Sequence, residues 1–314
     1  MLRYLLLPLL FLLASDVFSL TWKEPWQEEV IAKSDYFVLG RVLDAKPGSV
    51  KIKVLKQFGQ LRTEEVIVLE GYHMLDICSQ SDSDKVTFFF QMIDSVYLFL
   101  KKTDIGYCLP TPTSGYAIVA GGKVLSTFRH SYHQAQLTIP DYELCMSSIW
   151  NHCKGLTYDQ KKITDYISKN LNIKPAGFND REIDLFFRQH AALEVIYYCK
   201  LDDKWNVIQP FLNCSNSHLV ISAIRCLANY SSTQSRSLLL NILGSNNSSA
   251  FIKIIAAWSL KKTVVTENRK QIEELVKAAD EEEIGFSSNI MDPRACTTLG
   301  SVKGALEELL ASLQ

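Results

Sequence analysis

Between residues 182 and 279 the sequence repeats a short apolar helical pattern, with a small residue at the same place in each copy. The matched positions are Ala192, Ala223 and Ala256, which lie 31 residues apart (192 to 223) and 33 residues apart (223 to 256). A period of roughly this length holds two helices in each unit. One such pair cannot cover its apolar face alone, so neighbouring pairs must stack. The stretch therefore predicts an α-solenoid; an irregular helical bundle with accidental spacing is the alternative.

The period defines three helix pairs joined by short polar connectors. The predicted pairs are 183–199 with 204–212, 217–230 with 233–243, and 249–262 with 266–279. Connectors rich in Asp, Asn, Ser and Gly are typical of tight turns between antiparallel helices. This region resembles HEAT and armadillo-type repeats. Residues 284–300 lack the period and are predicted to form a loop, and the amphipathic segment 302–313 is predicted to cap the stack.

The stretch from residue 22 to about 137 is instead rich in β-forming residues. Apolar or alternating runs predict strands at 35–43, 50–58, 65–69, 85–91, 95–100, 116–119 and 123–128. Pro47-Gly48 and Gly121-Gly122 mark hairpin turns between them. Several short strands over such a length fit a small barrel or sandwich that curls to limit its exposed edges.

Residues 30–105 resemble the netrin module and the barrel of the tissue inhibitors of metalloproteinases. The resemblance rests on residues Ser34–Val42, Ile52–Gly59 and Tyr97–Leu100. It implies a small antiparallel barrel of the OB type. Those inhibitors chelate the protease zinc through an N-terminal cysteine, whereas the first cysteine here is Cys78. The resemblance therefore carries the fold and not that inhibitory mechanism.

The first 19 residues have the pattern of a secretory signal peptide. Arg3 precedes an apolar run over residues 4–14, and the small residues Val17 and Ser19 satisfy a cleavage rule before Leu20. The run is about half as long as the roughly 20 apolar residues that span a bilayer, which argues against a membrane anchor. We expect export to the periplasm or the extracellular space, with no stable membrane insertion after cleavage.

Together these patterns predict an α+β protein with two main domains. The expected order is a signal peptide at 1–19, an OB-like antiparallel β-barrel at 20–137, a helical adaptor at 138–178 and an all-α HEAT-like repeat domain at 179–314. The adaptor follows from helical spacing within 140–150 and 158–171. As a whole the chain resembles exported bacterial HEAT-repeat proteins with a β-rich N-terminal region, a group without an assigned reaction.

Eight cysteines in an exported chain are candidates for disulfide bonds. The candidate residues are Cys78, Cys108, Cys145, Cys153, Cys199 and Cys226. Cys145 and Cys153 would lie about 12 Å apart along a continuous helix. Because a disulfide requires Cα atoms within roughly 7 Å, these two can pair only if the chain turns between them. Cys199 and Cys226 are equally well explained as small buried apolar residues.

Four asparagines match the N-glycosylation sequence: Asn213, Asn229, Asn246 and Asn247. They would carry sugars in a eukaryotic secretory route and remain unmodified in most bacteria. Asparagine and serine are also common turn residues, which explains the same sequences equally well.

His130 and His133 are the candidate metal pair, although their spacing is a weak signal. Residues i and i+3 share a face on a helix and point to opposite sides of a strand. No carboxylate lies within the next seven residues, so we expect a structural role and assign no metal and no cofactor. Nucleophile elbows, phosphate-binding loops and His-Glu-x-x-His are absent from the sequence, so we expect no catalytic residues and no enzyme activity.

Charge composition bears on the class of partner. Lys and Arg number 33 and Asp and Glu number 34, which argues against nucleic acid or an anionic membrane surface. We expect a secreted or periplasmic, non-enzymatic scaffold that binds a protein or peptide through the solenoid, the barrel surface or both. The alternatives are a secreted protease inhibitor that uses the barrel rim and a metal-dependent hydrolase built around His130 and His133.

Overall fold

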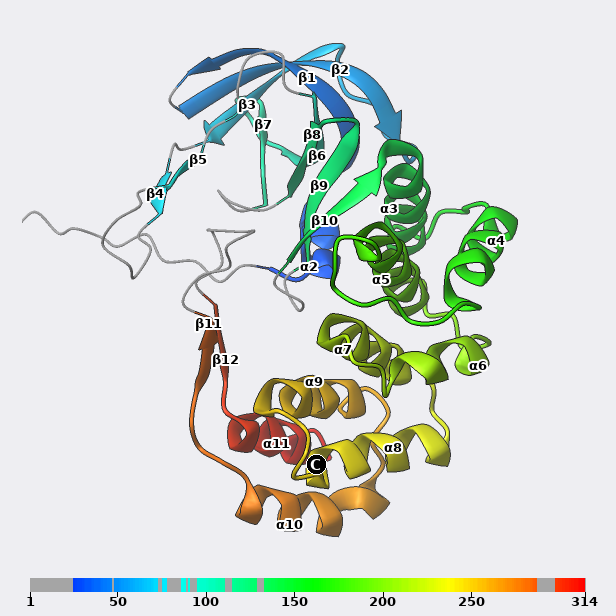
Figure 1. Cartoon of the computed structure of the whole chain (residues 1–314). Coiled ribbons are helices and arrows are strands. Elements are labelled where there is room, and N and C mark those ends of the chain that lie inside the picture. Colours follow the sequence, from blue (N-terminus) through cyan, green and yellow to red (C-terminus); the bar gives the residue numbers. More distant parts are fainter. Residues whose placement is uncertain are drawn as a thin grey trace, which may run out of the picture.

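The computed structural model describes residues 25–46, 48–72, 75–77, 86–88, 90, 95–110, 115–128, 133–286 and 297–313. These residues form an α+β protein with strands in the N-terminal part and helices in the C-terminal part (Figure 1). The elements change at Thr138, where β10 (His133–Thr138) meets α3 (Ile139–Cys153). The predicted signal peptide lies outside the described residues, and the domain boundaries stay a prediction. Among the described helices, none has both the length and the apolar composition that crossing a bilayer requires.

Five strands of the N-terminal sheet close into a barrel, which confirms the predicted barrel. Their order is β1 (Tyr36–Lys46), β2 (Gly48–Phe58), β3 (Val66–Tyr72), β7 (Tyr107–Cys108) and β6 (Ser95–Lys102). β3 and β7 pair in parallel through Leu69 and Tyr107, whereas the other neighbours are antiparallel. β6 returns to β1, with Phe99 opposite Phe37, and this pairing closes the ring. β8 (Tyr116–Ala120), β9 (Lys123–Phe128) and β10 extend the sheet from β6.

β6 is covered on both faces, which explains why its sequence is apolar instead of alternating. Val96, Leu98 and Leu100 belong to the apolar cluster inside the barrel, and Tyr97 and Phe99 belong to the cluster shared with the helices. Because side chains alternate along a strand, a strand buried on both sides needs apolar residues throughout. Phe37 on β1 stacks on Phe99 with ring centroids 4.5 Å apart, and its ring lies 5.8 Å from Trp150 of α3. The outer face of the barrel therefore shares a core with the helices.

Gly59 lies where this packing is closest. Its φ is +78°, in the left-handed region that favours glycine, and an added Cβ would lie 2.6 Å from Nε1 of Trp150. The turn after β2 can therefore approach α3 only because no side chain is present.

Several short elements differ from the sequence-based expectation. The structure adds α2 (Gln27–Lys33) and the strand β10, and it pairs β4 (Leu75–Ile77) with β5 (Val86–Phe88). The predicted loop over 284–300 is wrong at its ends, where β11 (Ile284–Phe286) pairs with β12 (Thr297–Gly300). Elements of two to seven residues are too short to show a clear period, so their partners decide where they form.

Helices occupy the chain from Ile139 to Ala311, interrupted by the β11–β12 pair. They are α3, α4 (Gln160–Leu171), α5 (Ile183–Tyr198), α6 (Trp205–Ile208) with η1 (Gln209–Phe211), α7 (Ser217–Cys226) with η2 (Leu227–Asn229), α8 (Thr233–Gly244), α9 (Ala250–Leu260), η3 (Thr266–Asn268) with α10 (Arg269–Ala278), and α11 (Val302–Ala311). Helices form at the places predicted for the members of the three pairs. The helix expected at 204–212 becomes a 3-10 turn from Gln209, because Pro210 has no N–H to continue the α-helical bonds.

Side-chain caps fix where several of these helices begin. The Asn216 side chain accepts bonds from the first N–H groups of α7, and serines at 232, 249 and 301 do the same for α8, α9 and α11. Each cap satisfies N–H groups that lack a partner within the helix. The polar connectors of the sequence therefore act as helix starts.

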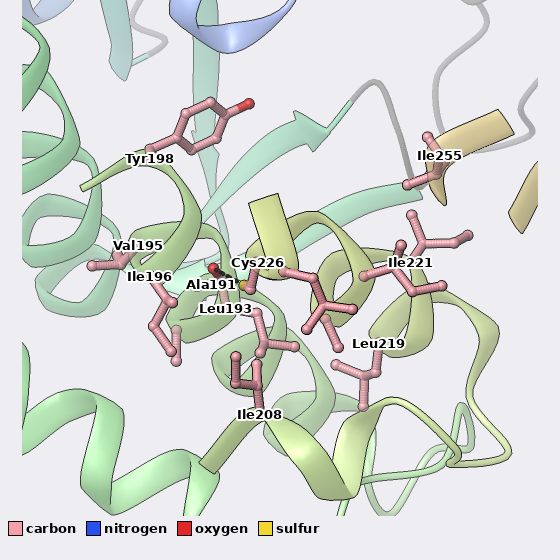
Figure 2. Close-up of a cluster of buried hydrophobic side chains, with 14 of the residues drawn as sticks. Ala191, Leu193, Val195, Ile196, Tyr198, Ile208, Leu219, Ile221, Cys226 and Ile255 are labelled. Atoms are coloured by element: carbon pink, nitrogen blue, oxygen red, sulfur yellow. Dashed lines mark hydrogen bonds between the residues drawn. The ribbon is translucent and has the colours of Figure 1, made fainter. Parts of the chain in front are cut away.

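The three matched alanines lie in the packed interior. Ala192 of α5, Ala223 of α7 and Ala256 of α9 are each 0% exposed. α5 packs against α7, α7 against α9, and α9 against α11 (Figure 1). Figure 2 shows the cluster between α5 and α7, where Cys226 Sγ donates to the carbonyl oxygen of Leu193 at 3.2 Å. Small residues at matched positions let successive helices approach one another closely.

Enlarging one of these alanines is expected to overpack the interior. Ala256→Leu should lower the free energy of unfolding by about 1–3 kcal/mol, because a dense core accommodates added methylenes only by strain. Ala278→Leu is the matched control, since Ala278 is exposed on α10. Urea denaturation of both variants checks the difference. Equal stability of the two would contradict close packing at the repeated position.

Candidate binding groove

Two adjoining cavities lie at the C-terminal ends of α5, α7 and α9. Their volumes are about 340 Å³ and about 660 Å³, and they share Glu28, Tyr197 and Lys262 in their walls. We call the combined hollow the α5–α9 groove. It is defined by Trp26, Glu28, Tyr197, Arg225, Trp258 and Lys262, with the end of α3 and part of α11 completing its rim.

The walls of the groove follow the same period as the buried alanines. The second residue after each alanine is Glu194, Arg225 or Trp258; the fifth is Tyr197, Ala228 or Lys261; the sixth is Tyr198, Asn229 or Lys262. All of these except Glu194 line one of the two cavities. The period of the sequence therefore recurs both at the buried alanines and in the walls of the groove.

A buried ion pair joins the first two helices beneath this surface. Arg225 is 4% exposed and Glu194 is 1% exposed, with Nη1 of Arg225 2.6 Å from Oε2 of Glu194. Nη2 of Arg225 donates to the Tyr198 hydroxyl at 3.0 Å. Burial alone would lower the pKa of the Arg225 guanidinium, but Glu194 and the neighbouring tyrosines outweigh burial and hold it well above its usual value. The arginine therefore stays charged inside the protein.

Aromatic rings surround the same guanidinium. Cζ of Arg225 lies 4.0 Å from the ring centroid of Tyr197 and 5.6 Å from that of Trp26. Trp26 in turn meets Trp258 edge to face, with centroids 5.8 Å apart and planes at 84°. A cation over an aromatic face is attracted by the ring quadrupole. Arg225 therefore holds one helix end and two aromatic walls in a fixed relation.

The N-terminal part of the chain contributes to the groove through the short helix α2 and the residue before it, because Trp26 and Glu28 lie in the cavity walls. Figure 1 shows α2 near the start of the helical region, below the barrel. Val30 and Ile31 are buried, which anchors the helix. After α2, the Ser34 hydroxyl donates to the Val30 carbonyl at 2.7 Å, and Nζ of Lys154 donates to the Ser34 carbonyl at 2.6 Å. Glu28 in the first turn then reaches both cavities. Residues far apart in the sequence thus share one hollow.

Basic side chains outnumber acidic ones in the wider cavity. Lys200 and Lys262 lie there with Glu28 as the carboxylate. Lys262 donates to the Tyr197 hydroxyl, and its Nζ lies 4.6 Å from the Tyr197 ring centroid. Burial, and then the charge of Lys200, lower the pKa of His152, so its imidazole is neutral at neutral pH. The wider cavity is therefore positively charged.

Lys200 also has an uncommon backbone conformation. Among the described non-glycine residues it alone has a left-handed φ, 53°. It directly follows the Cys199 cap of α5, where helices commonly end with glycine. A lysine at this place costs conformational energy that glycine would not. The chain therefore keeps a positive charge at the rim of the groove at the expense of backbone strain.

The structure contains free thiols at the described cysteines. They are Cys108, Cys145, Cys153, Cys199, Cys214 and Cys226, whereas Cys78 and Cys296 lie outside the described residues. Cys145 and Cys153 lie on the continuous helix α3, so the turn that their pairing required is not formed. Burial raises the pKa of Cys199 to about 12 and the pKa of Cys226 well above its usual value. Both thiols stay protonated and pack as apolar groups.

The side chains of the candidate histidine pair lie outside the part of the chain that the structure describes. His130 lies outside the described residues, and of His133 only the backbone is described, in β10 opposite Phe128. Within the described part of the chain, no group of three or more His, Cys, Asp or Glu side chains is placed to hold a metal ion.

Sequence reasoning did not single out Trp26, Tyr197, Arg225, Trp258 or Lys262. Counting fixed offsets from the matched alanines would have found Tyr197, Arg225 and Trp258 on α5, α7 and α9, and Lys262 just after α9. Trp26 gave no such signal, because α2 lies within a stretch whose composition favours strands.

Breaking the buried ion pair is expected to be costly. Arg225→Met should reduce the free energy of unfolding by about 3–5 kcal/mol, because Glu194 loses the opposite charge that Arg225 supplies in the interior. The double variant Glu194→Leu/Arg225→Met should recover much of this loss, since no buried charge remains. Chemical denaturation measures both.

The exposed pair between Lys261 and Glu308, 3.5 Å apart, provides the control. Lys261→Met should cost less than about 1 kcal/mol, as solvent-exposed pairs contribute little. A loss for Arg225→Met as small as that for Lys261→Met would contradict a buried, structurally required pair.

Comparisons of the chain with protein-family models, with curated proteins and with solved structures gave no match.

Proposed function

We propose that the chain is a non-enzymatic, secreted or periplasmic scaffold whose α5–α9 groove holds an extended segment of a partner protein. The main support for the proposal is that the residues lining the groove recur with the period of the matched alanines. Equivalent positions at the C-terminal ends of α5, α7 and α9 line one hollow, and most of them carry aromatic or basic side chains instead of the uniformly apolar residues of a core. Repeat proteins bind partners on surfaces built in this way.

A HEAT-like solenoid is part of this proposal. Its support is the packing of α5 on α7 and α7 on α9 in chain order, together with a fully buried alanine at the matched place in each. The closing helix α11 packs on α9, which is the place of a cap in such an array.

We also assign the barrel to the OB class within the same proposal. The strand order β1-β2-β3-β7-β6, the return to β1 and the parallel pairing of β3 with β7 support this assignment. The barrel packs against α3, and β1 follows α2 directly. In this account the barrel holds one wall of the groove in place.

The side chains of the groove favour a segment with an acidic residue beside an aromatic or large apolar one. Trp26, Tyr197 and Trp258 offer aromatic surface, which commonly dominates binding energy at interfaces. Lys200 and Lys262 offer positive charge at the wider cavity. Charge complementarity of this kind sets specificity and the rate of encounter. Export rests on the signal-peptide pattern of residues 1–19.

A displayed library of random peptides tests the proposal without a known partner. The full chain should enrich a family of peptides with an acidic residue near an aromatic one. Synthetic copies should then bind with a Kd that isothermal titration calorimetry resolves. Lys262→Glu should weaken binding about tenfold or more, equivalent to roughly 1.4 kcal/mol, because it reverses a charge in the wall.

Two further variants separate binding from stability. Lys270→Glu makes the same charge change on exposed α10 and should leave binding unchanged. Lys200→Gly should relieve the left-handed φ and leave the protein at least as stable, yet it should weaken binding. Failure to enrich any peptide family would refute the proposed function, as would equal binding by the Lys262→Glu and Lys270→Glu variants.

A further inference from the structure

The four glycosylation sequences lie at two different ends of the helices. Asn213 lies between η1 and α7, three residues before the Asn216 cap, and Asn246 lies between α8 and α9, three residues before the Ser249 cap. These two asparagines are 33 residues apart (213 to 246), as are Ala223 and Ala256. They therefore occupy the same position in successive units.

Both turns present their asparagines to solvent. Asn213, Ser215 and Asn246 are exposed. Asn247, next to Asn246, is also exposed. The serine of its glycosylation sequence is Ser249, whose hydroxyl already accepts the N–H of Ile252 as the cap of α9. The serine of the Asn246 glycosylation sequence is Ser248, which has no part in that cap. The turn therefore favours glycosylation of Asn246 over glycosylation of Asn247.

Asn229 lies in a different environment. It is half-buried in η2, its Nδ2 donates to the carbonyl oxygen of Ile196 at 2.8 Å, and it lines the wider cavity. This amide nitrogen is the atom to which a sugar would be attached. A glycan there would displace the contact with α5 and fill the groove.

The length of α7 separates the two environments. α7 spans Ser217–Cys226, ten residues, and at 1.5 Å per residue it is about 15 Å long. Asn213 precedes its first turn, and Asn229 follows its last. Sugars on the turns before α7 and α9 would therefore cover the edge of the helices opposite the α5–α9 groove.

We propose that Asn213 and Asn246 are N-glycosylated, and that Asn229 and Asn247 are not. The inference rests on the export that is part of the proposed function, taken through a eukaryotic secretory route. In the reaction, Nδ2 of the asparagine attacks C1 of the reducing sugar of a lipid-linked pyrophosphate oligosaccharide. The C1–O bond breaks as the C1–N bond forms, Nδ2 gives up one proton to the solvent, and the lipid pyrophosphate leaves with the electron pair of the C1–O bond. The glycans coat one edge of the helical region and leave the groove open to its partner.

Expression of the full chain in cultured animal cells tests this inference. Chain recovered from the medium is sequenced at its N-terminus and, separately, treated with the glycosidase that releases N-glycans and leaves aspartate. Peptide mapping should find aspartate at 213 and 246 and asparagine at 229 and 247. Ser215→Ala and Ser248→Ala should each lose one glycan, seen as one step in gel mobility.

Ser231→Ala is the matched control. The substitution abolishes the glycosylation sequence of Asn229 by changing only an exposed serine. It should change neither the gel mobility of the chain nor its secretion. A secreted chain without glycans, or with a glycan at Asn229 or Asn247, would overturn the inference while leaving export intact. A chain that is not exported would overturn the proposed export and this inference together.

Discussion

A charge buried between two helices needs an opposite charge directly beside it, and this constraint fixes how α7 lies on α5. Arg225 and Glu194 are both almost fully buried and lie 2.6 Å apart, so displacing either helix would leave a charge in the interior without its partner. Tyr198 accepts a further bond from the same guanidinium, and the rings of Tyr197 and Trp26 pack around it. The walls of the groove therefore take their positions from an interaction in the core.

The barrel also helps to form the groove, because it positions α2 and the residues Trp26 and Glu28 that complete the groove wall. Its outer face, with Phe37 and Phe99, shares a core with Trp150 of α3. Lys154, at the end of the same helix, holds the backbone at Ser34, where α2 leads into β1. Barrel, α3 and α2 are thus one packed unit, and Trp26 and Glu28 reach the helix ends as a result.

Much of the fold could be predicted from local patterns in the sequence. Strand alternation, helical spacing and the caps at Asn216 and Ser249 act over a few residues, so they are visible without knowledge of the fold. The matched alanines also mark positions that are fully buried in the structure. The closure of the barrel through β7 could not be predicted in this way, since two residues carry no period. The same holds for the seven-residue helix α2.

The candidate site was harder to predict than the fold. Arginine is normally a surface residue, and the partner that buries Arg225 lies 31 residues earlier in the sequence. The histidine pair attracted attention because metal-ligand spacing is easily recognised, yet spacing alone does not show what surrounds a side chain. The residues of the groove could have been predicted from a simpler signal, because aromatic and basic residues recur at fixed offsets from the repeated alanine.

Hydrogen exchange on the full chain, with and without a selected peptide, tests the central claim most directly. If the groove is the binding surface, the peptide should slow exchange at the ends of α5, α7 and α9, around residues 197–200, 226–230 and 259–263, and in α2. Slowed exchange confined to the barrel strands or to α8 and α10, with these helix ends unchanged, would contradict the account.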